Sequence, residues 1–276
     1  MIKNLRERMK QKSPLIHCIT NPISMNQCAN AILAMGACPI MAEHPQEVEE
    51  ITRTAGALLL NLGNLSDVRM EAMKLALQEA GRCKIPVILD SVGVACSKLR
   101  RTFANDLLQT SALTVMKGNA SEILAWNREE YHAVGIDAEN NIKIEDVISA
   151  AVSLAKTYHS IVLVSGKTDL ITDGNKLVQI ENGTSQLTTI TGTGCMLGAV
   201  CACCLAVERT IEAPVTACAI MGICGELAET EKGSGSFQVN LLDELSIWKE
   251  ETLQKFLKEE VKQVEEYGFQ ALYGHR

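Results

Sequence analysis

The sequence predicts an α/β protein with a central, mostly parallel sheet, helices on both faces of that sheet and a β-hairpin at one edge. Short apolar runs alternate with longer stretches of helical periodicity up to about residue 165. The apolar runs are hydrophobic at nearly every position, which is typical of parallel strands buried on both faces. Two further short apolar runs flank Asp173 and Gly174 within residues 168–180, and this pattern predicts the hairpin.

The expected elements follow one another in a regular order. We expect strands at residues 37–41, 57–61, 85–90, 113–117 and 161–165, with helices near residues 22–35, 46–54, 66–81, 97–110 and 145–157. Residues 187–190 have the pattern of one more short strand, and residues 212–230 form an alanine-rich helical stretch. Apolar residues at helical spacing over 240–267 predict an amphipathic terminal helix. Because no repeat or linker interrupts the chain, we expect one domain, residues 1–276.

Composition argues against several classes of function. The chain carries 33 acidic and 26 basic residues, and its densest basic cluster spans only residues 98–101, which argues against nucleic-acid binding. Apolar runs stay well short of the roughly 20 residues of a membrane span. The first residues are charged and lack the apolar core of a signal peptide. Eleven cysteines in such a chain indicate reduced thiols and a cytoplasmic location.

Residues 165–168, Ser-Gly-Lys-Thr, resemble the end of a phosphate-binding P-loop. That motif requires a glycine five positions before Gly166, where the chain has Ile161 inside an expected strand. The motif must also open into a helix, whereas here the hairpin follows. We therefore expect that Lys167 is not a P-loop lysine. Ser165 ends a buried strand, where ligands commonly bind in open α/β sheets.

The strongest local signal is the segment TGTGC, residues 191–195, which opens a long apolar helix. Glycines and small hydroxyl residues leave the backbone N–H groups of a helix start bare, and the helix dipole adds partial positive charge there. Such a site suits an anion. A dinucleotide-binding fingerprint is excluded because its third glycine would fall on Leu197. A tight turn before a buried helix remains the alternative.

Cysteines in this helix have two different interpretations. Cys195 lies in the first turn, where a thiolate is favoured, although a small buried residue is the alternative in a cysteine-rich chain. Cys201, Cys203 and Cys204 lie in an apolar run without a second cysteine pair or a nearby histidine. For these three we expect packing in the core and not metal binding.

Polar residues also follow two other expected strands. Lys117 ends one strand, and Asn119 and Glu122 are three residues apart on the helical turn that follows. An amide and a carboxylate at this spacing share a face and can hold a hydrated Mg²⁺ beside phosphates, but the same spacing also caps an ordinary helix. Asp90 ends another strand and faces the crevice at its carboxyl end. These signals all lie at one edge of the expected sheet, where they can converge.

Seven segments of the chain occur together in one family. These are PLIHCITNPISMNQCANAILAMGACPIMA at residues 14–42, NLGNL, LDSVGV, KGNASEI, SGKTDLITDG, TGTGC and GSGSFQVNLLDEL. In this order and over nearly the whole chain, the segments resemble the hydroxyethylthiazole kinase family, the thiamine-salvage members of the ribokinase-like superfamily. The resemblance implies a ribokinase-like fold and ATP-dependent, Mg²⁺-assisted phosphorylation of 4-methyl-5-(2-hydroxyethyl)thiazole.

Roles for individual residues follow from the resemblance together with the motifs above. We expect catalytic roles for Cys195, Gly194 and Thr193, thiazole contacts by Met41, Gly192 and Asn21, ATP contacts by Lys117, Ser165 and Asn119, and a metal site at Glu122 and Asp90. Known relatives form homotrimers with active sites at subunit interfaces, so a homotrimer is expected, without nucleic-acid or membrane partners.

The chain departs from the family pattern in a few places. Ser91 and Ser234 stand where the family often has proline, which affects loop rigidity and removes no charge. Related sugar kinases carry aspartate in place of Cys195. Two alternatives stay open: an enzyme that uses Cys195 as a covalent nucleophile, for which no pattern identifies a base, and a non-catalytic thiazole-binding protein of the same fold.

Overall fold

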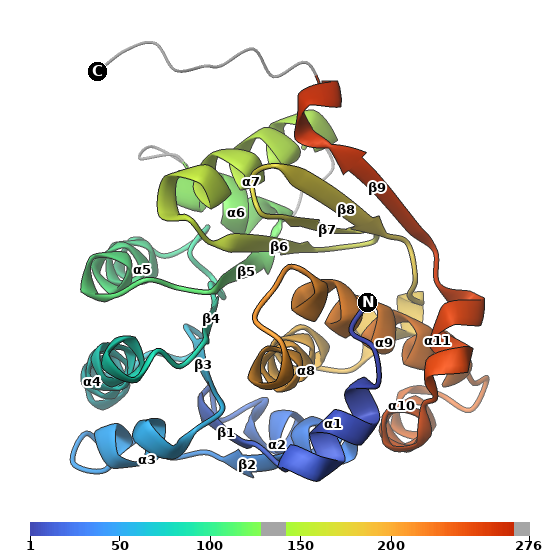
Figure 1. The fold of residues 1–276 in the computed structure, drawn as a ribbon, viewed down its shortest axis with the longest axis horizontal. Helices are drawn as coiled ribbons and strands as arrows, with labels where there is room; N and C mark the ends of the chain where they lie inside the picture. Colours follow the sequence, from blue (N-terminus) through green and yellow to red (C-terminus); the bar gives the residue numbers. More distant parts are fainter. Residues whose placement is uncertain (128–141, 268–276) are drawn as a thin grey trace.

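The computed structural model describes residues 1–127 and 142–267. Within them a nine-stranded sheet runs through the molecule in the order β2-β1-β3-β4-β5-β6-β7-β8-β9 (Figure 1). The strands are β1 (Leu15–Ile19), β2 (Cys38–Ile40), β3 (Ala57–Asn61), β4 (Val87–Asp90), β5 (Val115–Asn119), β6 (Ile161–Ser165), β7 (Asp169–Thr172), β8 (Lys176–Ile180) and β9 (Glu259–Gln263). Strands β1 to β6 pair in parallel, and β7 to β9 continue the sheet antiparallel. The expected parallel sheet with an antiparallel edge is confirmed.

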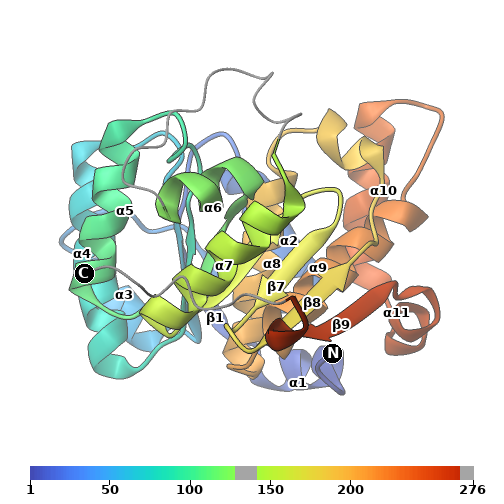
Figure 2. The same ribbon diagram turned by 90° about the horizontal axis from the view of Figure 1, so that it is seen from above.

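Helices lie on both sides of the sheet, as expected (Figures 1 and 2). One side carries α3 (Val48–Thr54), α4 (Asp67–Cys83), α5 (Lys98–Thr110), α6 (Ala120–Asn127) and α7 (Ile144–Tyr158). The other side carries α1 (Leu5–Lys12), α2 (Met25–Met35), α8 (Thr193–Val207), α9 (Glu212–Leu227), α10 (Ser234–Ile247) and α11 (Glu250–Phe256). Of two short 3₁₀ helices, η2 (Ser185–Thr189) packs through Leu187 against the core on that side, and η3 (Val264–Tyr267) packs through Val264 against the core of α3 to α7.

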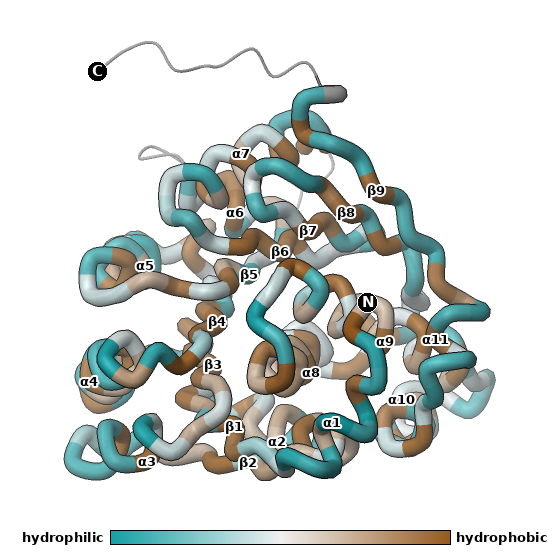
Figure 3. Tube along the Cα trace, viewed as in Figure 1, coloured by the Kyte–Doolittle hydropathy of each residue, from teal (hydrophilic) through white to brown (hydrophobic). Residues whose placement is uncertain are grey.

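Alternating strand residues divide the interior into two apolar cores. Leu59, Ile88 and Val115 face the core formed with α2, α8 and α9. Leu58 and Leu60 face the core formed with α3 to α7, because successive strand residues point to opposite faces. Figure 3 shows that hydrophobic residues are concentrated along the strands of the sheet and along α8. The doubly wound arrangement therefore follows from strands that are apolar on both faces.

Helix α8 lies in the middle of the core that it forms with α2 and α9, and it is buried on nearly all sides. Its residues Cys201, Cys203 and Cys204 are fully buried among apolar neighbours, so the expectation of core packing is confirmed. Within the described residues, no group of three or more His, Cys, Asp or Glu side chains is arranged to hold a metal ion. The same residues include no helix that is both long enough and apolar enough to cross a membrane.

The hairpin is confirmed and explains the Ser-Gly-Lys-Thr segment. Strand β6 ends at Ser165, and the antiparallel pair β7 and β8 follows. Gly174 adopts a φ of 92° in the turn, which glycine tolerates, and Asp173 accepts hydrogen bonds from two backbone N–H groups there. Strand β7, and not a helix, begins two residues after Lys167, so the segment is not a P-loop.

Two expectations for the C-terminal half are wrong. Residues 187–190 form no strand, because residues 185–189 wind into η2. The single terminal helix over 240–267 is instead α10, α11 and the edge strand β9, which pairs with β8. Backbone angles turn extended at Trp248 and Leu257, and the charged sequence EEVKQ suits an exposed edge strand more than a helix packed on the core.

Two elements at the other end of the chain were not expected. Helix α1 and strand β1 precede the first expected helix. Strand β1 contains His17, a polar residue that weakened the apolar pattern. Its ring nitrogens bond Thr52 Oγ1 and the carbonyl of Ala42, each at 2.9 Å, so the buried histidine is fully satisfied.

Candidate active site

The carboxyl ends of four adjacent strands bring polar side chains together. Asn61 at the end of β3 is in register with Asp90 at the end of β4, and Asp90 is in register with Lys117 on β5. Asn21 follows β1, the strand that flanks β3 on the side opposite β4. Parallel strands end at the same edge of the sheet, so the polar residues collect there, beside the start of α8.

Lys117 and Asp90 form a buried ion pair at this edge. Lys117 Nζ lies 3.1 Å from Asp90 Oδ1, and the two side chains are only 4% and 2% exposed. Burial raises the pKa of Asp90, against the lowering effect of the Lys117 charge. Burial lowers the pKa of Lys117, but the charges of Asp90, Cys195 and Glu122 outweigh it and raise that pKa to about 12. Lys117 is therefore a fixed positive charge at neutral pH.

A chain of hydrogen bonds joins this pair to Cys195. Asn61 Nδ2 donates to Asp90 Oδ2 at 3.1 Å and to Cys195 Sγ at 3.3 Å. Asn21 Nδ2 donates to Asn61 Oδ1 at 3.0 Å and approaches Cys195 Sγ at 3.6 Å. The structure thus brings together Asp90, Lys117 and Cys195, whose convergence the motifs predict, and it adds Asn21, for which the resemblance implies a substrate contact. Sequence reasoning missed Asn61; its signal was a polar residue that ends the apolar strand ALLLN, just before Leu62 and Gly63.

The start of α8 is open to an anion. Gly192 caps the helix with a φ of 88°, and no side chain caps the first turn. Among the described residues, no backbone or side-chain acceptor faces the N–H groups of residues 193–195. A Cβ atom on Gly194 would lie 3.9 Å from Lys117 Nζ, so the ammonium group approaches the same turn. Positive charge from the helix end and from Lys117 is therefore concentrated at one place.

A cavity of about 620 Å³ adjoins this helix start. Leu187, Leu197 and Met221 provide apolar walls, while Thr193 and Gly194 lie at the end that leads to Lys117. Ser165, Gly166, Lys167, Asp169, Asn182, Gly183, Thr184, Ser185, Thr188 and Gly222 complete the lining. The volume lies within the range of ordinary small-molecule sites. An apolar chamber that ends at an anion site suits a ligand with a flat ring and a phosphate tail.

Asn119 and Glu122 form the predicted pair at the start of α6. Asn119 Oδ1 accepts from the Glu122 N–H at 2.9 Å, and Glu122 Oε2 accepts from the Asn119 N–H at 2.8 Å. Glu122 Oε1 accepts from the Gly93 N–H at 2.7 Å, which ties down the loop after β4. The helix-capping alternative is therefore realised. It is compatible with ion binding, since each carboxylate oxygen accepts more than one bond.

A magnesium ion would fit this edge through water molecules. Both oxygens of Asp90 are engaged by Lys117 and Asn61, and both oxygens of Glu122 bond backbone N–H groups. Burial raises the pKa of Glu122, as does the charge of Asp90, against the opposing backbone hydrogen bonds. Mg²⁺ usually keeps several waters and needs few direct protein ligands when phosphates are present. Carboxylates engaged in this way fit a hydrated ion better than a directly ligated one.

Three predicted residues lie at the margins of this site. Thr193 Oγ1 donates to the Leu187 carbonyl at 2.9 Å, so its hydroxyl holds η2 against α8. Gly192 packs against Ser24 of the segment before α2. Met41 follows β2, half-buried against the core of α2 and α8, and belongs neither to the polar chain nor to the cavity lining. Contacts of Met41 and Gly192 with a thiazole stay predictions.

The described histidines give Cys195 no base. Burial lowers the pKa of His17, and its ring is engaged by Thr52 and Ala42. His44 Nδ1 accepts the N–H of Gln46, and His159 caps the end of α7. His132 lies outside the described residues. Among the side chains that the structure describes, only Asn21 and Asn61 hydrogen-bond the sulfur, an arrangement unlike a cysteine–histidine pair.

Comparison with known proteins agrees with the motifs. A family model described as the hydroxyethylthiazole kinase family matches residues 6–251. The hydroxyethylthiazole kinase 2 of Clostridium botulinum (strain Hall) is 44% identical over 246 residues, which cover 87% of this chain and 93% of that protein. The chain belongs to the hydroxyethylthiazole kinase family. Its members are kinases, so the open helix start and the adjoining cavity belong to a phosphate-transferring enzyme.

Solved structures support the family and the fold. The hydroxyethylthiazole kinase from Pyrococcus horikoshii OT3 superimposes with a TM-score of 0.84 at 33% identity, covering 94% of this chain and 97% of that one. A ribokinase-like superfamily protein from Enterococcus faecalis V583 superimposes with a TM-score of 0.65 at 14% identity, covering 92% and 95%. The second similarity concerns the fold alone, and it confirms the ribokinase-like architecture.

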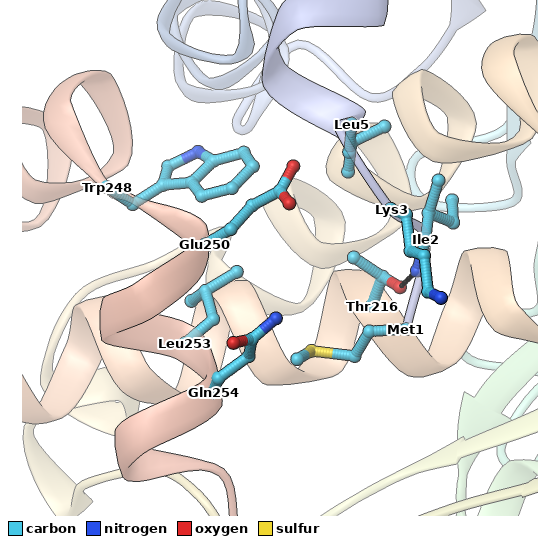
Figure 4. Close-up of a pocket in the computed structure, with 9 residues that line it drawn as sticks. All are labelled: Met1, Ile2, Lys3, Leu5, Thr216, Trp248, Glu250, Leu253 and Gln254. Atoms are coloured by element: carbon cyan, nitrogen blue, oxygen red, sulfur yellow. Dashed lines mark hydrogen bonds between the residues drawn. The ribbon is translucent and has the colours of Figure 1, made fainter.

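A smaller cavity of about 200 Å³ lies away from the kinase site, between the first residues and α11 (Figure 4). The N–H of Ile2 donates to Thr216 Oγ1 at 2.9 Å, and the ammonium group of Met1 pairs with Glu212 at 2.5 Å. These bonds attach the first residues to α9. Trp248 and Glu250 are among its lining residues, which include no residue of the start of α8. Of these two cavities, the larger one adjoins the start of α8, through Thr193 and Gly194.

Proposed function

We propose that this chain transfers the γ-phosphoryl group of ATP to the hydroxyl of 4-methyl-5-(2-hydroxyethyl)thiazole, in thiamine biosynthesis or salvage. The observation that carries the proposal is the open start of α8 beside Lys117 and Cys195, at the end of the 620 Å³ cavity. Family membership supplies the substrate and the reaction class.

The reaction requires positioning and charge neutralisation. The hydroxyl oxygen forms a bond to the γ-phosphorus, the bond from that phosphorus to the bridging oxygen of ADP breaks, and the hydroxyl releases its proton. The N–H groups of residues 193–195 and the Lys117 ammonium stabilise negative charge on the transferring group. Cys195 lies beside the substrate hydroxyl as a weak base or hydrogen-bond partner. A loose transition state needs little base strength.

Magnesium is part of the proposal. Glu122, Asn119 and Asp90 would hold the hydrated ion at the edge of the sheet, together with phosphate oxygens. When bound, the ion supplies positive charge to the phosphates. The protein contributes a rigid carboxylate at Glu122, which is fixed by two backbone N–H groups.

Further parts of the proposal concern binding and assembly. Ser165 and Asn119 contact ATP, and Met41, Gly192 and Asn21 contact the thiazole. Residues 1–276 act as one kinase domain; continuity of one sheet from β2 to β9 supports this. We also propose a cytoplasmic homotrimer with active sites at subunit interfaces. Placement of Met41 outside the cavity lining is compatible with contact to a neighbouring subunit's substrate.

One assay separates this function from its alternatives. ADP release is followed in a coupled assay with ATP and Mg²⁺, with and without the thiazole alcohol, and the product is identified by mass spectrometry. Thiazole-dependent ADP release with a phosphorylated alcohol is expected. Thiazole binding without ADP release would favour the non-catalytic binding protein. A covalent adduct on Cys195 that forms during turnover would favour the cysteine nucleophile.

A further inference from the structure

The orientation of the Asn61 amide is fixed by a backbone group. Asn61 Oδ1 lies 2.9 Å from the N of Gly63, and a backbone N–H can only donate. The oxygen of the amide must therefore face Gly63, which removes the usual ambiguity between the oxygen and nitrogen of an asparagine. Asn61 Nδ2 consequently faces Asp90 Oδ2 and Cys195 Sγ, at 3.1 and 3.3 Å.

Asn21 is oriented in the same manner. Its Oδ1 accepts the backbone N–H of Ser24 at 3.0 Å, so its Nδ2 points to Asn61 Oδ1 and toward Cys195 Sγ. Asn61 is fully buried and Asn21 nearly so, which leaves neither amide a choice of solvent partners. Two amide donors therefore converge on one sulfur atom.

The convergence determines what the sulfur can do. A sulfur that receives two N–H donors acts as a hydrogen-bond acceptor on that side. Any proton on Cys195 must point away from both amides. Cys195 lies in the first turn of α8, so this free side of the sulfur belongs to the open helix start.

We propose that Asn61 is a positioning residue for phosphoryl transfer, which holds the Cys195 sulfur as the acceptor of the substrate hydroxyl proton. Gly63 fixes the amide from one side, and Asp90 takes its second N–H. Through Asp90 the same asparagine links the proton acceptor to the Lys117 charge at the phosphate site. The inference rests on the proposed kinase function and gives a role to Asn61, the first residue of the segment NLGNL, to which the resemblance assigned none.

A double-mutant cycle tests whether Asn61 acts through Cys195. Asn61→Ala should lower kcat by about tenfold or more, since one hydrogen bond to a charged group is lost. In a Cys195→Ala background the same change should cost less than about twofold, because the interaction is already absent. The exposed residue Asn26 on α2 provides the control Asn26→Ala, which should leave kcat unchanged. Equal losses in both backgrounds would show a merely structural role and overturn the proposal.

A second readout needs no kinase activity, so it separates this proposal from the proposed function. Alkylation of Cys195 by iodoacetamide is followed by mass spectrometry of its peptide, with the exposed Cys38, Cys83 and Cys96 as internal standards. In Asn61→Ala the alkylation rate at Cys195, relative to the three internal standards, should change at least about tenfold at neutral pH, because the sulfur loses the donor that orients it.

Other alkylation results contradict the idea. An unchanged rate at Cys195 in a folded Asn61→Ala protein, or an equal change at Cys195 and at Cys38, Cys83 and Cys96, would show that the amide does not act on this sulfur. If Asn61→Ala fails to fold, Asn21→Ala removes the more distant of the two donors to Cys195 and should change the alkylation rate at Cys195 in the same direction by a smaller factor. An unchanged alkylation rate in a folded Asn21→Ala protein would then overturn the proposal.

Discussion

Lys117 Nζ and Asp90 Oδ1 are 3.1 Å apart, at the ends of neighbouring strands and almost out of contact with solvent. Helix α8 packs directly over this pair: a Cβ atom on Gly198 would lie 3.6 Å from Asp90 Oδ2 and 3.9 Å from Lys117 Cδ. The pair is thus sealed between the sheet and the helix that bears Cys195. Each charge depends mainly on the other, because neither has a second partner at salt-bridge distance among the described residues.

Asp90→Asn should therefore destabilise the protein by about 3–5 kcal/mol, since it leaves a buried ammonium without its counter-charge. The midpoint of urea unfolding measures this change. The exposed pair of Lys74 and Asp106 offers a matched control. Asp106→Asn should cost less than about 1 kcal/mol. Similar midpoints for the two variants would show that burial of the Lys117–Asp90 pair has no energetic consequence.

Glu122→Gln should raise the Mg²⁺ concentration needed for half-maximal turnover, because one anionic charge near the phosphates is lost. The variant should fold, although a glutamine cannot accept from both Gly93 and Asn119 with its amide nitrogen facing one of them. A loss of about 1–2 kcal/mol in unfolding free energy is expected on that ground. An unchanged magnesium titration would refute the assignment of Glu122.

Lys167→Ala should leave ATP binding nearly intact. Lys167 lines the cavity but lies between β6 and β7, without a loop that wraps phosphate. The KM for ATP should change by less than about tenfold, in contrast to the loss of a lysine that contacts the β- and γ-phosphates directly. If nucleotide binding disappeared in a folded variant, our interpretation of this segment would be wrong.

Replacement of Cys195 by Asp, Ser and Ala should separate kinase chemistry from nucleophilic catalysis. Asp provides the carboxylate that related kinases use and should keep or improve phosphorylation; Ser should retain part of the activity and Ala less. General-base assistance contributes only about 10²–10⁴-fold, and the start of α8 remains in every variant. Product formation from ATP and the thiazole alcohol is measured, with circular dichroism as the folding control.

A covalent mechanism predicts a different result for the same three variants. All three would be nearly inactive, and a cysteine-linked intermediate would accumulate in the parent protein. A folded but inactive Cys195→Asp variant, together with a trapped phosphocysteine or acylcysteine, would exclude the transfer mechanism proposed above.

Alkaline pH should destabilise the protein unusually steeply. Burial raises the pKa of Cys28 and Cys224 to about 12 and raises the pKa of the other five buried thiols as well. Unfolded thiols lose their protons near about pH 8.5, while the folded ones keep them. The unfolded state then binds fewer protons, so stability falls as pH rises, by about 1.4 kcal/mol per pH unit for each thiol.

The fall of stability with rising pH is tested by measuring urea unfolding midpoints between neutral pH and about pH 10. The buried Cys203 and the exposed Cys38 form a matched pair. Cys203→Ala should reduce the loss of unfolding free energy per pH unit by the contribution of one buried thiol, whereas Cys38→Ala should leave that loss unchanged. A midpoint that stays constant above pH 8.5 would contradict the burial argument.

Much of the fold could be predicted because its strands are apolar on both faces and its turns carry recognisable residues. Strand β3 and strand β6 were placed at their observed bounds by their continuous apolar runs. Strand β1 was missed because His17 interrupts its apolar run, and the partners that satisfy this histidine come from distant segments. Strand β9 was taken for a helix because its charged residues are compatible with either an exposed helix face or a sheet edge.

The parts of the site that could be predicted are the residues whose side chains are charged or reactive in themselves. Lys117, Asp90 and Cys195 are reactive or charged residues at recognisable positions, so their convergence could be anticipated. Asn61 could not be anticipated, because an amide has no distinctive chemistry until its partners are known. Its role depends on a donor from Gly63 and on the approach of α8, and both are products of the tertiary structure.

The position of α8 against the strands also has a consequence for synthesis on the ribosome. Leu59, Ile88 and Val115 present an apolar surface that α8 and its neighbours cover, yet α8 ends only at Val207. At roughly 5–20 residues per second, about ten seconds pass between translation of β4 and completion of α8. During this interval α8 does not yet cover that face of the nascent sheet. We therefore expect the emerging chain to expose apolar surface until α8 has been made.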